Sequence, residues 1–180
     1  MAAQTLSTDD MAEELIQFTR TEAVLREYGE RVAELYREGM RRNGHFTMSP
    51  DTLINHVDVV VENDHGGGLA VSLLLAEYWK YVEWGTRPHL PPKGALLEWI
   101  RLKPVLPHPD DRGRIPTPEQ LDDLIRWKIA QEGTTGTEDL EAAMVAANER
   151  YLPRIEDAIV EDIGDSTETA VRIMLASHDR

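Results

Sequence analysis

The stretch YWKYVEWGTRPHLPP, residues 78–92, combines aromatic side chains, one glycine and three prolines within fifteen positions. Tyr81 and Trp84 are large enough to bury much apolar area. Gly85 permits the positive φ that residues with a Cβ avoid, and Pro88 favours an extended conformation in the residue before it. The stretch therefore predicts a buried aromatic turn that leads into a rigid, extended and exposed strip.

A long β-hairpin is predicted just before this stretch, over residues 53–75. In residues 53–61 and 69–75, apolar side chains recur at every second position and would lie on one face, and this period of two is typical of strands. Residues 63–68 between them read NDHGGG, and asparagine, aspartate and glycine are common turn residues. The hairpin is expected to have a long tip and to continue directly into the aromatic stretch.

Residues 8–42 predict a long N-terminal helix, because their apolar side chains recur at three- and four-residue spacing. A helix broken near residues 19–21 is the alternative. Residues 93–103 predict a short helix with several apolar side chains. Residues 104–116 contain four prolines and one glycine, which favours an exposed loop.

Residues 117–163 predict two C-terminal helices. Thr117 and Gln120 have the spacing of a capping box at the start of the first helix. Pro153 is expected to kink or interrupt the second, which should end near residue 163. The alternating β-branched residues of 168–177 favour a final strand.

Together these elements predict an α+β fold in a single domain of 180 residues. A small antiparallel β-sheet built on the long hairpin is expected to be packed by the long N-terminal helix and the C-terminal helices. The absence of cysteine excludes a disulfide scaffold, a thiol nucleophile and thiolate metal sites. The N-terminus has no features of a secretory signal, and no apolar run reaches the roughly 18–20 residues that span a bilayer.

The formal net charge of −14 argues against a domain that binds nucleic acid by neutralising phosphates. Residues 117–180 hold 15 acidic against 6 basic side chains. A solvent-exposed helical surface explains this excess of acidic side chains. The alternative is an acidic surface that DNA passes without binding.

Three short segments resemble enzyme motifs but lack the residues that the chemistry needs. His65–Gly68 spells the oxyanion-hole motif HGGG of some esterases, yet no Gly-x-Ser-x-Gly nucleophile elbow occurs in the chain. His108–Asp111 lies in a proline-rich loop without a second histidine at helical spacing. Gly133–Gly136 is no P-loop, because no lysine follows the last glycine. The sequence therefore predicts no catalytic, metal or cofactor site.

Two stretches resemble a family of tailed-bacteriophage proteins. YVEWGTRPH, residues 81–89, is similar to the Y-V-E-[FYW]-G-T-x-P-H motif of the head–tail joining or tail-completion proteins of lambda-like siphophages. RWKIAQEGTTGTEDL, residues 126–140, is similar to the later W-x-x-x-K-I…G-T-x-G-T segment of that family, and the order of the two is the same. Where family members often have an aromatic-proline run, this chain has Glu138, Asp139 and Leu140.

The resemblance implies a structural virion protein without enzymatic activity or cofactor, assembled in the cytoplasm of the bacterial host. It would join the head to the tail as a ring of identical copies, a hexamer or higher. Its other partners would be connector or portal-side proteins and tail-tube or tail-terminator proteins, while genome DNA passes through without specific binding and no membrane is involved. The interface residues implied by the two motifs are Tyr81, Val82, Glu83, Trp84, Gly85, Thr86, Arg87, Pro88, His89, Gly133, Thr134, Gly136 and Thr137.

Glu83 and Arg87 are the charged pair in this stretch. They are expected to form a salt bridge that fixes the loop or joins two subunits, and a weak surface pair is the alternative. The four tryptophans are expected to be core anchors, although tryptophan is also enriched at interface hot spots. A small hydrolase that uses the HGGG tip or the His108–Asp111 loop, and a generic adaptor protein, remain the alternative functions.

Overall fold

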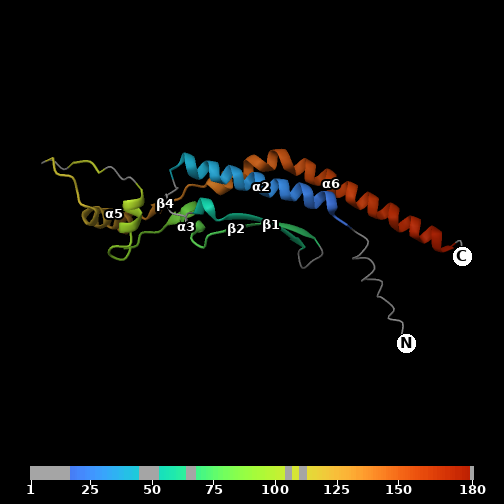
Figure 1. Ribbon diagram of the computed structural model, residues 1–180, viewed down its shortest axis with the longest axis horizontal. Coiled ribbons are helices and arrows are strands. Elements are labelled where there is room, and N and C mark those ends of the chain that lie inside the picture. Colours follow the sequence, from blue (N-terminus) through green and yellow to red (C-terminus); the bar gives the residue numbers. More distant parts are fainter. Residues whose placement is uncertain (1–16, 45–52, 64–67, 104–106, 110–112, 179–180) are drawn as a thin grey trace, which may run out of the picture. The chain divides into compact units, whose positions relative to one another are not determined.

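The computed structural model describes residues 17–44, 53–63, 68–103, 107–109 and 113–178, and it confirms the α+β fold. A long helix, α2 (Thr19–Arg42), packs against a longer one, α6 (Asp139–His178), and against an antiparallel hairpin (Figure 1). The hairpin consists of β1 (Val57–Asn63) and β2 (Leu69–Leu75). Among the described residues, no helix has both the length and the apolar character needed to cross a membrane.

By internal packing the chain divides into two compact units. The first consists of Met1–Glu34, Asp58–Leu74 and Ala143–Arg180, and the second of Leu35–Val57 and Leu75–Ala142. The first unit therefore holds most of the hairpin and of α6, whereas the second holds the remaining short elements.

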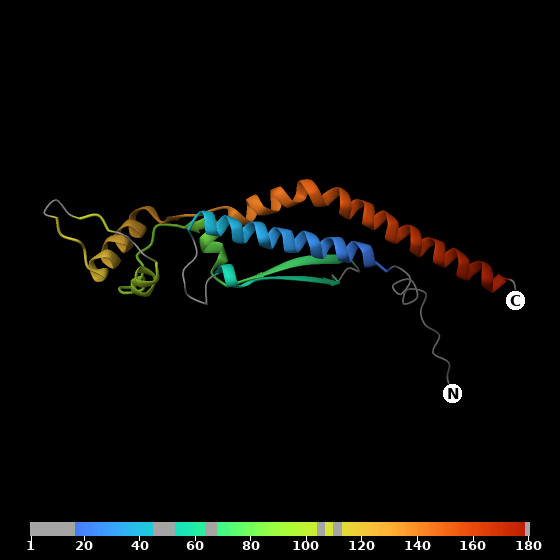
Figure 2. The ribbon, with the colours of Figure 1, turned by 45° about the horizontal axis from the view of Figure 1, so that its top comes forward.

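The first unit is built in layers, with α2 between the hairpin and α6 (Figure 2). Gly29 of α2 faces the hairpin, where an added Cβ would lie 2.5 Å from a methyl carbon of Val59 and 2.8 Å from one of Val71. On the other side of α2, the rings of Tyr28 and Tyr151 meet edge to face at 6.1 Å. The lack of a side chain at residue 29 thus lets the sheet approach the helix closely.

The start of α2 is fixed by a residue of α6. One carboxylate oxygen of Asp162 accepts hydrogen bonds from the Thr21 backbone N–H and hydroxyl, both at 2.8 Å, and the other accepts from the Arg20 backbone N–H at 3.3 Å. Burial by itself would raise the pKa of Asp162, but these bonds outweigh it and the pKa is lowered.

The described part of the predicted N-terminal helix begins later than the sequence pattern indicated. Residues 17 and 18 are not helical, and α2 starts at Thr19. The physical reason is the cap that Asp162 supplies to the first turn. The predicted helical residues 8–16 lie outside the part of the chain that the structure describes.

The predicted end of the last helix near residue 163 and the predicted final strand were wrong, because α6 runs without interruption from Asp139 to His178. It passes through Pro153, and it continues beyond residue 163 over the predicted strand. In this extension, the hydroxyl groups of Ser166, Thr167 and Thr169 each donate to the backbone carbonyl four residues earlier, at 2.8–2.9 Å. The polar side chains of this segment therefore bond along the helix instead of interrupting it.

The short elements of the second unit differ in part from their predicted bounds. Residues Leu53–Asn55, expected to begin the first strand, form a 3₁₀ turn. The helix expected over residues 93–103 is confined to α4 (Leu97–Leu102), since residues 93–96 form turns. Of the predicted loop over residues 104–116, the described positions 107–109 and 113–116 are neither helix nor strand.

Helix α5 (Pro118–Glu132) begins as predicted. The Thr117 hydroxyl accepts a hydrogen bond from the Gln120 backbone N–H at 3.3 Å, and the Gln120 side chain accepts one from the Thr117 N–H at 3.0 Å. The buried carboxylate of Asp122 accepts hydrogen bonds from the backbone of Gly94 and Leu96, at 2.8 and 3.1 Å. Asp122 thereby holds the turns before α4 against α5.

Candidate functional site

The two stretches that carry the family resemblance meet in the second unit. Strand β3 (Gly85–Thr86) pairs antiparallel with β4 (Thr134–Thr135), so that Gly85 lies opposite Thr135 and Thr86 opposite Thr134. The hydroxyl oxygens of Thr86 and Thr134 are 3.1 Å apart, within hydrogen-bonding distance, although 48 positions separate the two residues in the sequence. We call this β3–β4 pair and the turns that flank it, residues 82–89 and 133–138, the junction.

Backbone hydrogen bonds extend the junction on both sides of the short strands. The N–H of Thr137 donates to the carbonyl of Val82 at 3.1 Å, and the N–H of Glu138 donates to the carbonyl of Glu83 at 3.2 Å. At the other end, the N–H of His89 donates to the carbonyl of Ile129 in α5 at 3.3 Å. The junction is therefore held mainly by main-chain groups.

Three glycines make this close pairing possible. Gly85 and Gly133 have positive φ angles of 72° and 74°. A Cβ added to Gly85 would overlap the carbonyl oxygen of Thr134, and one added to Gly133 would overlap that of Thr86. A Cβ on Gly136 would overlap the carbonyl oxygen of Glu83. The main chains approach so closely that no side chain fits at these positions.

Glu83 is the buried residue of α3 (Trp79–Trp84), with only 2% of its surface exposed. Its carboxylate accepts hydrogen bonds from the backbone N–H groups of Leu140 and Glu141, all at 3.0 Å. These N–H groups belong to the first turn of α6, where helical N–H groups lack a helical partner and a negative charge is favoured. Glu83 thus caps α6 and connects it to α3.

The prediction that Glu83 and Arg87 form a salt bridge that fixes the loop was therefore wrong. None of the ion pairs found among the described residues joins these two side chains, and Arg87 is exposed. The start of α6 offers Glu83 two N–H donors in a buried position, whereas Arg87 lies beyond Gly85, where the chain has turned.

The aromatic side chains of α3 do not form the predicted buried plug. Tyr81 is 55% exposed and Trp84 is 67% exposed, and the rings of Trp79 and Trp84 pack on each other with centroids 5.1 Å apart. Because α3 has only six residues, it offers one narrow inner side, and Glu83 occupies it. The expectation that tryptophans are core anchors also fails for Trp127 of α5, which is largely exposed.

The strip that follows β3 is exposed, as predicted. Arg87, Pro88, His89 and Leu90 all face solvent. The ring nitrogen Nδ1 of His89 is 2.9 Å from the Arg87 carbonyl oxygen. After the strip, the chain is anchored at Pro91, which is buried and whose carbonyl accepts a hydrogen bond from Arg126 Nε at 2.8 Å.

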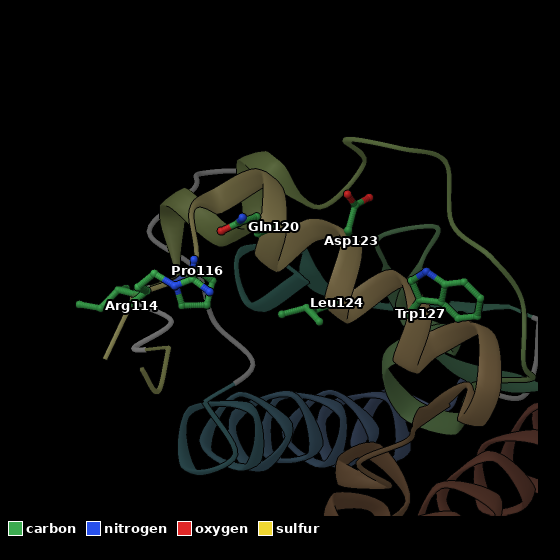
Figure 3. Close-up of a pocket in the computed structure, with 7 residues that line it drawn as sticks. Arg114, Pro116, Gln120, Asp123, Leu124 and Trp127 are labelled. Carbon is green, nitrogen blue, oxygen red and sulfur yellow. The ribbon is translucent and has the colours of Figure 1, made fainter. Parts of the chain in front are cut away.

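A groove of about 510 Å³ lies along α5 and the segment before it (Figure 3). Three of its apolar side chains, Ile115, Leu124 and Trp127, are mostly exposed. Sequence reasoning missed this groove, because Leu121, Leu124 and Ile125 recur at the helical spacing that is typical of a buried helix face. The remaining lining residues are Arg114, Pro116, Gln120 and Asp123.

The enzyme-like motifs gain no partners in the described structure. His108 is exposed, while His65–Gly67 and Asp110–Asp111 lie outside the described ranges. Within those ranges, no group of three or more histidine, aspartate or glutamate side chains is placed to hold a metal ion. Comparison of the chain with protein-family models, curated proteins and solved structures finds no match.

Proposed function

We propose that this chain is a structural virion protein of a tailed bacteriophage, which joins the head to the tail as a component of a neck or tail-completion ring. The proposal rests on the two stretches, residues 81–89 and 126–140, that resemble the joining proteins of lambda-like siphophages. The observation that supports it most directly is the junction, where the two stretches pair through β3 and β4. Motifs that form one substructure are expected to occur together.

The surface next to the junction has the composition of a protein contact. Trp84, Arg87 and Leu90 are exposed within seven positions, and tryptophan and arginine are enriched among residues that dominate binding energy. The hydrogen bond from the His89 N–H to Ile129 and the buried anchor at Pro91 fix the backbone of this strip. A strip that is already ordered loses little conformational entropy on docking, which favours affinity.

In this proposal the partners are further copies of the chain, in a closed ring of six or more, and the proteins above and below that ring. These are connector or portal-side proteins towards the head and tail-tube or tail-terminator proteins towards the tail. A closed ring suits a channel for DNA, and cyclic symmetry gives every copy the same contacts. The net charge of −14 fits a wall along which genome DNA passes without specific binding. Neither catalysis nor a cofactor is required.

The test is the substitution Arg87→Glu in a phage that encodes this chain. The isolated protein should remain folded, because a change at an exposed charge usually alters stability by less than about 0.5 kcal/mol. Docking should weaken, because a reversed charge at an interface disfavours the contact by up to several kcal/mol. Electron microscopy should then show filled heads and separate tails with few joined particles.

The matched control is Arg101→Glu, which reverses an exposed charge on α4 away from the junction stretches. This variant should yield joined, infectious particles at the normal level. Normal yields for Arg87→Glu as well would remove the strip from the joining contact. Absence of portal and tail-tube genes near the coding gene would contradict the phage role as a whole, and light scattering that shows only monomers at all concentrations would argue against a ring.

A further inference from the structure

Three buried side-chain oxygens in the second unit have no hydrogen-bond partner among the described residues: Tyr36 Oη, Thr137 Oγ1 and Asp139 Oδ2. Tyr36 is fully buried, and Asp139 is 7% exposed. Buried polar atoms of this kind are rare in folded proteins, because each loses its bonds to water without replacement. Their occurrence on neighbouring segments calls for a common explanation.

The backbone places Asp139 over the face of α2 that carries Tyr36. Gly39 lies on that face one turn after Tyr36, and a Cβ added to it would lie 2.5 Å from Asp139 Oδ1. Asn43, one further turn along, donates from its Nδ2 to the same oxygen at 2.8 Å. Asp139 is thus fixed above Gly39 by one carboxylate oxygen, while its second oxygen, Oδ2, has no hydrogen-bond partner among the described residues.

The electrostatics of Tyr36 agree with this placement. Burial raises the pKa of its hydroxyl, and the negative charges of Glu83 and Asp139 raise it further, with Tyr78 adding a smaller effect. The hydroxyl therefore keeps its proton and is available as a donor. Thr137 is two residues before Asp139, and the bond from its N–H to the Val82 carbonyl holds it in the junction.

We propose that one water molecule is bound inside the second unit, between Tyr36 Oη, Thr137 Oγ1 and Asp139 Oδ2. Tyr36 donates a hydrogen bond to the water, and the water donates one to the carboxylate of Asp139. The Thr137 hydroxyl can take either role. A water molecule offers two donors and two acceptors and typically makes about three bonds to buried polar groups, which is the number present here.

A metal ion is the weaker occupant. Such a site would have two carboxylates, Glu83 and Asp139, and both oxygens of Glu83 already accept backbone N–H bonds. No set of three or more histidine, aspartate or glutamate side chains surrounds the site within the described residues. The water would instead connect α2, the turn after β4 and the first residue of α6 by hydrogen bonds that the side chains do not make directly.

Oxygen-17 relaxation dispersion of water tests the proposal, because it counts internal waters that exchange slowly. Tyr36→Phe removes one of the three partners without changing the shape of the side chain, and it should lower the count by one. Tyr28→Phe is the matched control: the Tyr28 hydroxyl already bonds to Asn148 Oδ1 at 3.0 Å, so the count should equal that of the wild type. An unchanged count for Tyr36→Phe would overturn the proposal.

A high-resolution crystal structure of the wild-type protein provides a second, independent test. It should show one water within hydrogen-bonding distance of all three oxygens. A direct bond between Tyr36 and Asp139, an empty site, or an ion with metal–oxygen distances well below those of hydrogen bonds would contradict the inference. This test uses the wild-type protein, so it does not depend on whether Tyr36→Phe folds. Thr137→Val removes another of the three partners at a partly buried residue, and it should likewise lower the number of slowly exchanging internal waters by one.

Discussion

The junction of the second unit and the pairing of α2 with α6 in the first unit bring distant segments together by different means. In the junction, main-chain groups bond to main-chain groups, and three glycines leave the space for them. Between α2 and α6, side chains make the contact: Tyr28 with Tyr151, and Asp162 with the first turn of α2. A contact made by backbones tolerates no added atom, whereas a contact made by side chains can repack.

Breaking the junction should have the largest effect. In Gly136→Ala the new Cβ would overlap the backbone carbonyl oxygen of Glu83, which cannot move without breaking the bond from Glu138. We expect a loss of about 4 kcal/mol or more in the free energy of unfolding, the range of exceptional substitutions. Chemical denaturation measures it.

Gly113→Ala is the control for the glycine substitution. Its φ of 73° lies in the left-handed region that disfavours alanine, a penalty that Gly136 does not carry, but no atom lies within 4 Å of the added Cβ. It should cost about 1–2 kcal/mol, the penalty of a left-handed residue without a clash. If the two variants melted alike, the close approach of the main chains would not be what makes residue 136 special.

Weakening the side-chain contact should have an intermediate effect. Asp162→Asn removes the charge of the cap and replaces one of its two acceptor oxygens with an NH2 group, so we expect a loss of about 1–3 kcal/mol. The matched control is Asp165→Asn, which removes the charge of an exposed carboxylate whose ion pair, among the described residues, is with Arg20. Chemical denaturation at neutral pH should show a larger loss in the free energy of unfolding for Asp162→Asn than for Asp165→Asn.

The pH dependence of the cap gives a further check on the same residue. The folded-state pKa of Asp162 lies below its usual value, so the folded state favours the charged carboxylate. Its contribution is present above the unfolded-state pKa of about 3.9 and is lost as the pH falls through the lower folded-state pKa. Asp162→Asn should therefore lose less stability on acidification than the wild type, and equal slopes would contradict this role.

The smallest effect on stability is expected next to the junction itself. Trp84 directly precedes Gly85, yet its side chain is mostly exposed. Trp84→Ala should change the free energy of unfolding by about 0.5 kcal/mol or less, as surface substitutions do. A loss of several kcal/mol, as for a core tryptophan, would show that side chains and not only main-chain bonds hold the junction.

The sequence by itself determined what depends on near neighbours. The Thr117–Gln120 capping box involves residues three positions apart, and the positive φ of Gly85 follows from the properties of glycine. The alternation of residues 53–61 and 69–75 predicted the paired strands, because a half-buried strand requires that period, although the first strand forms only from Val57. The exposed strip at Arg87 followed from the prolines around it.

The tertiary structure decided whatever depends on distant residues. The start of α2 is set by Asp162, 141 positions from Thr21, and the burial of Glu83 is set by the first turn of α6, 57 positions away. Trp84 is exposed because Glu83 occupies the inner side of α3. No local pattern contains these partners: a side chain's burial depends on what the fold places against it, and a residue's type alone does not decide that.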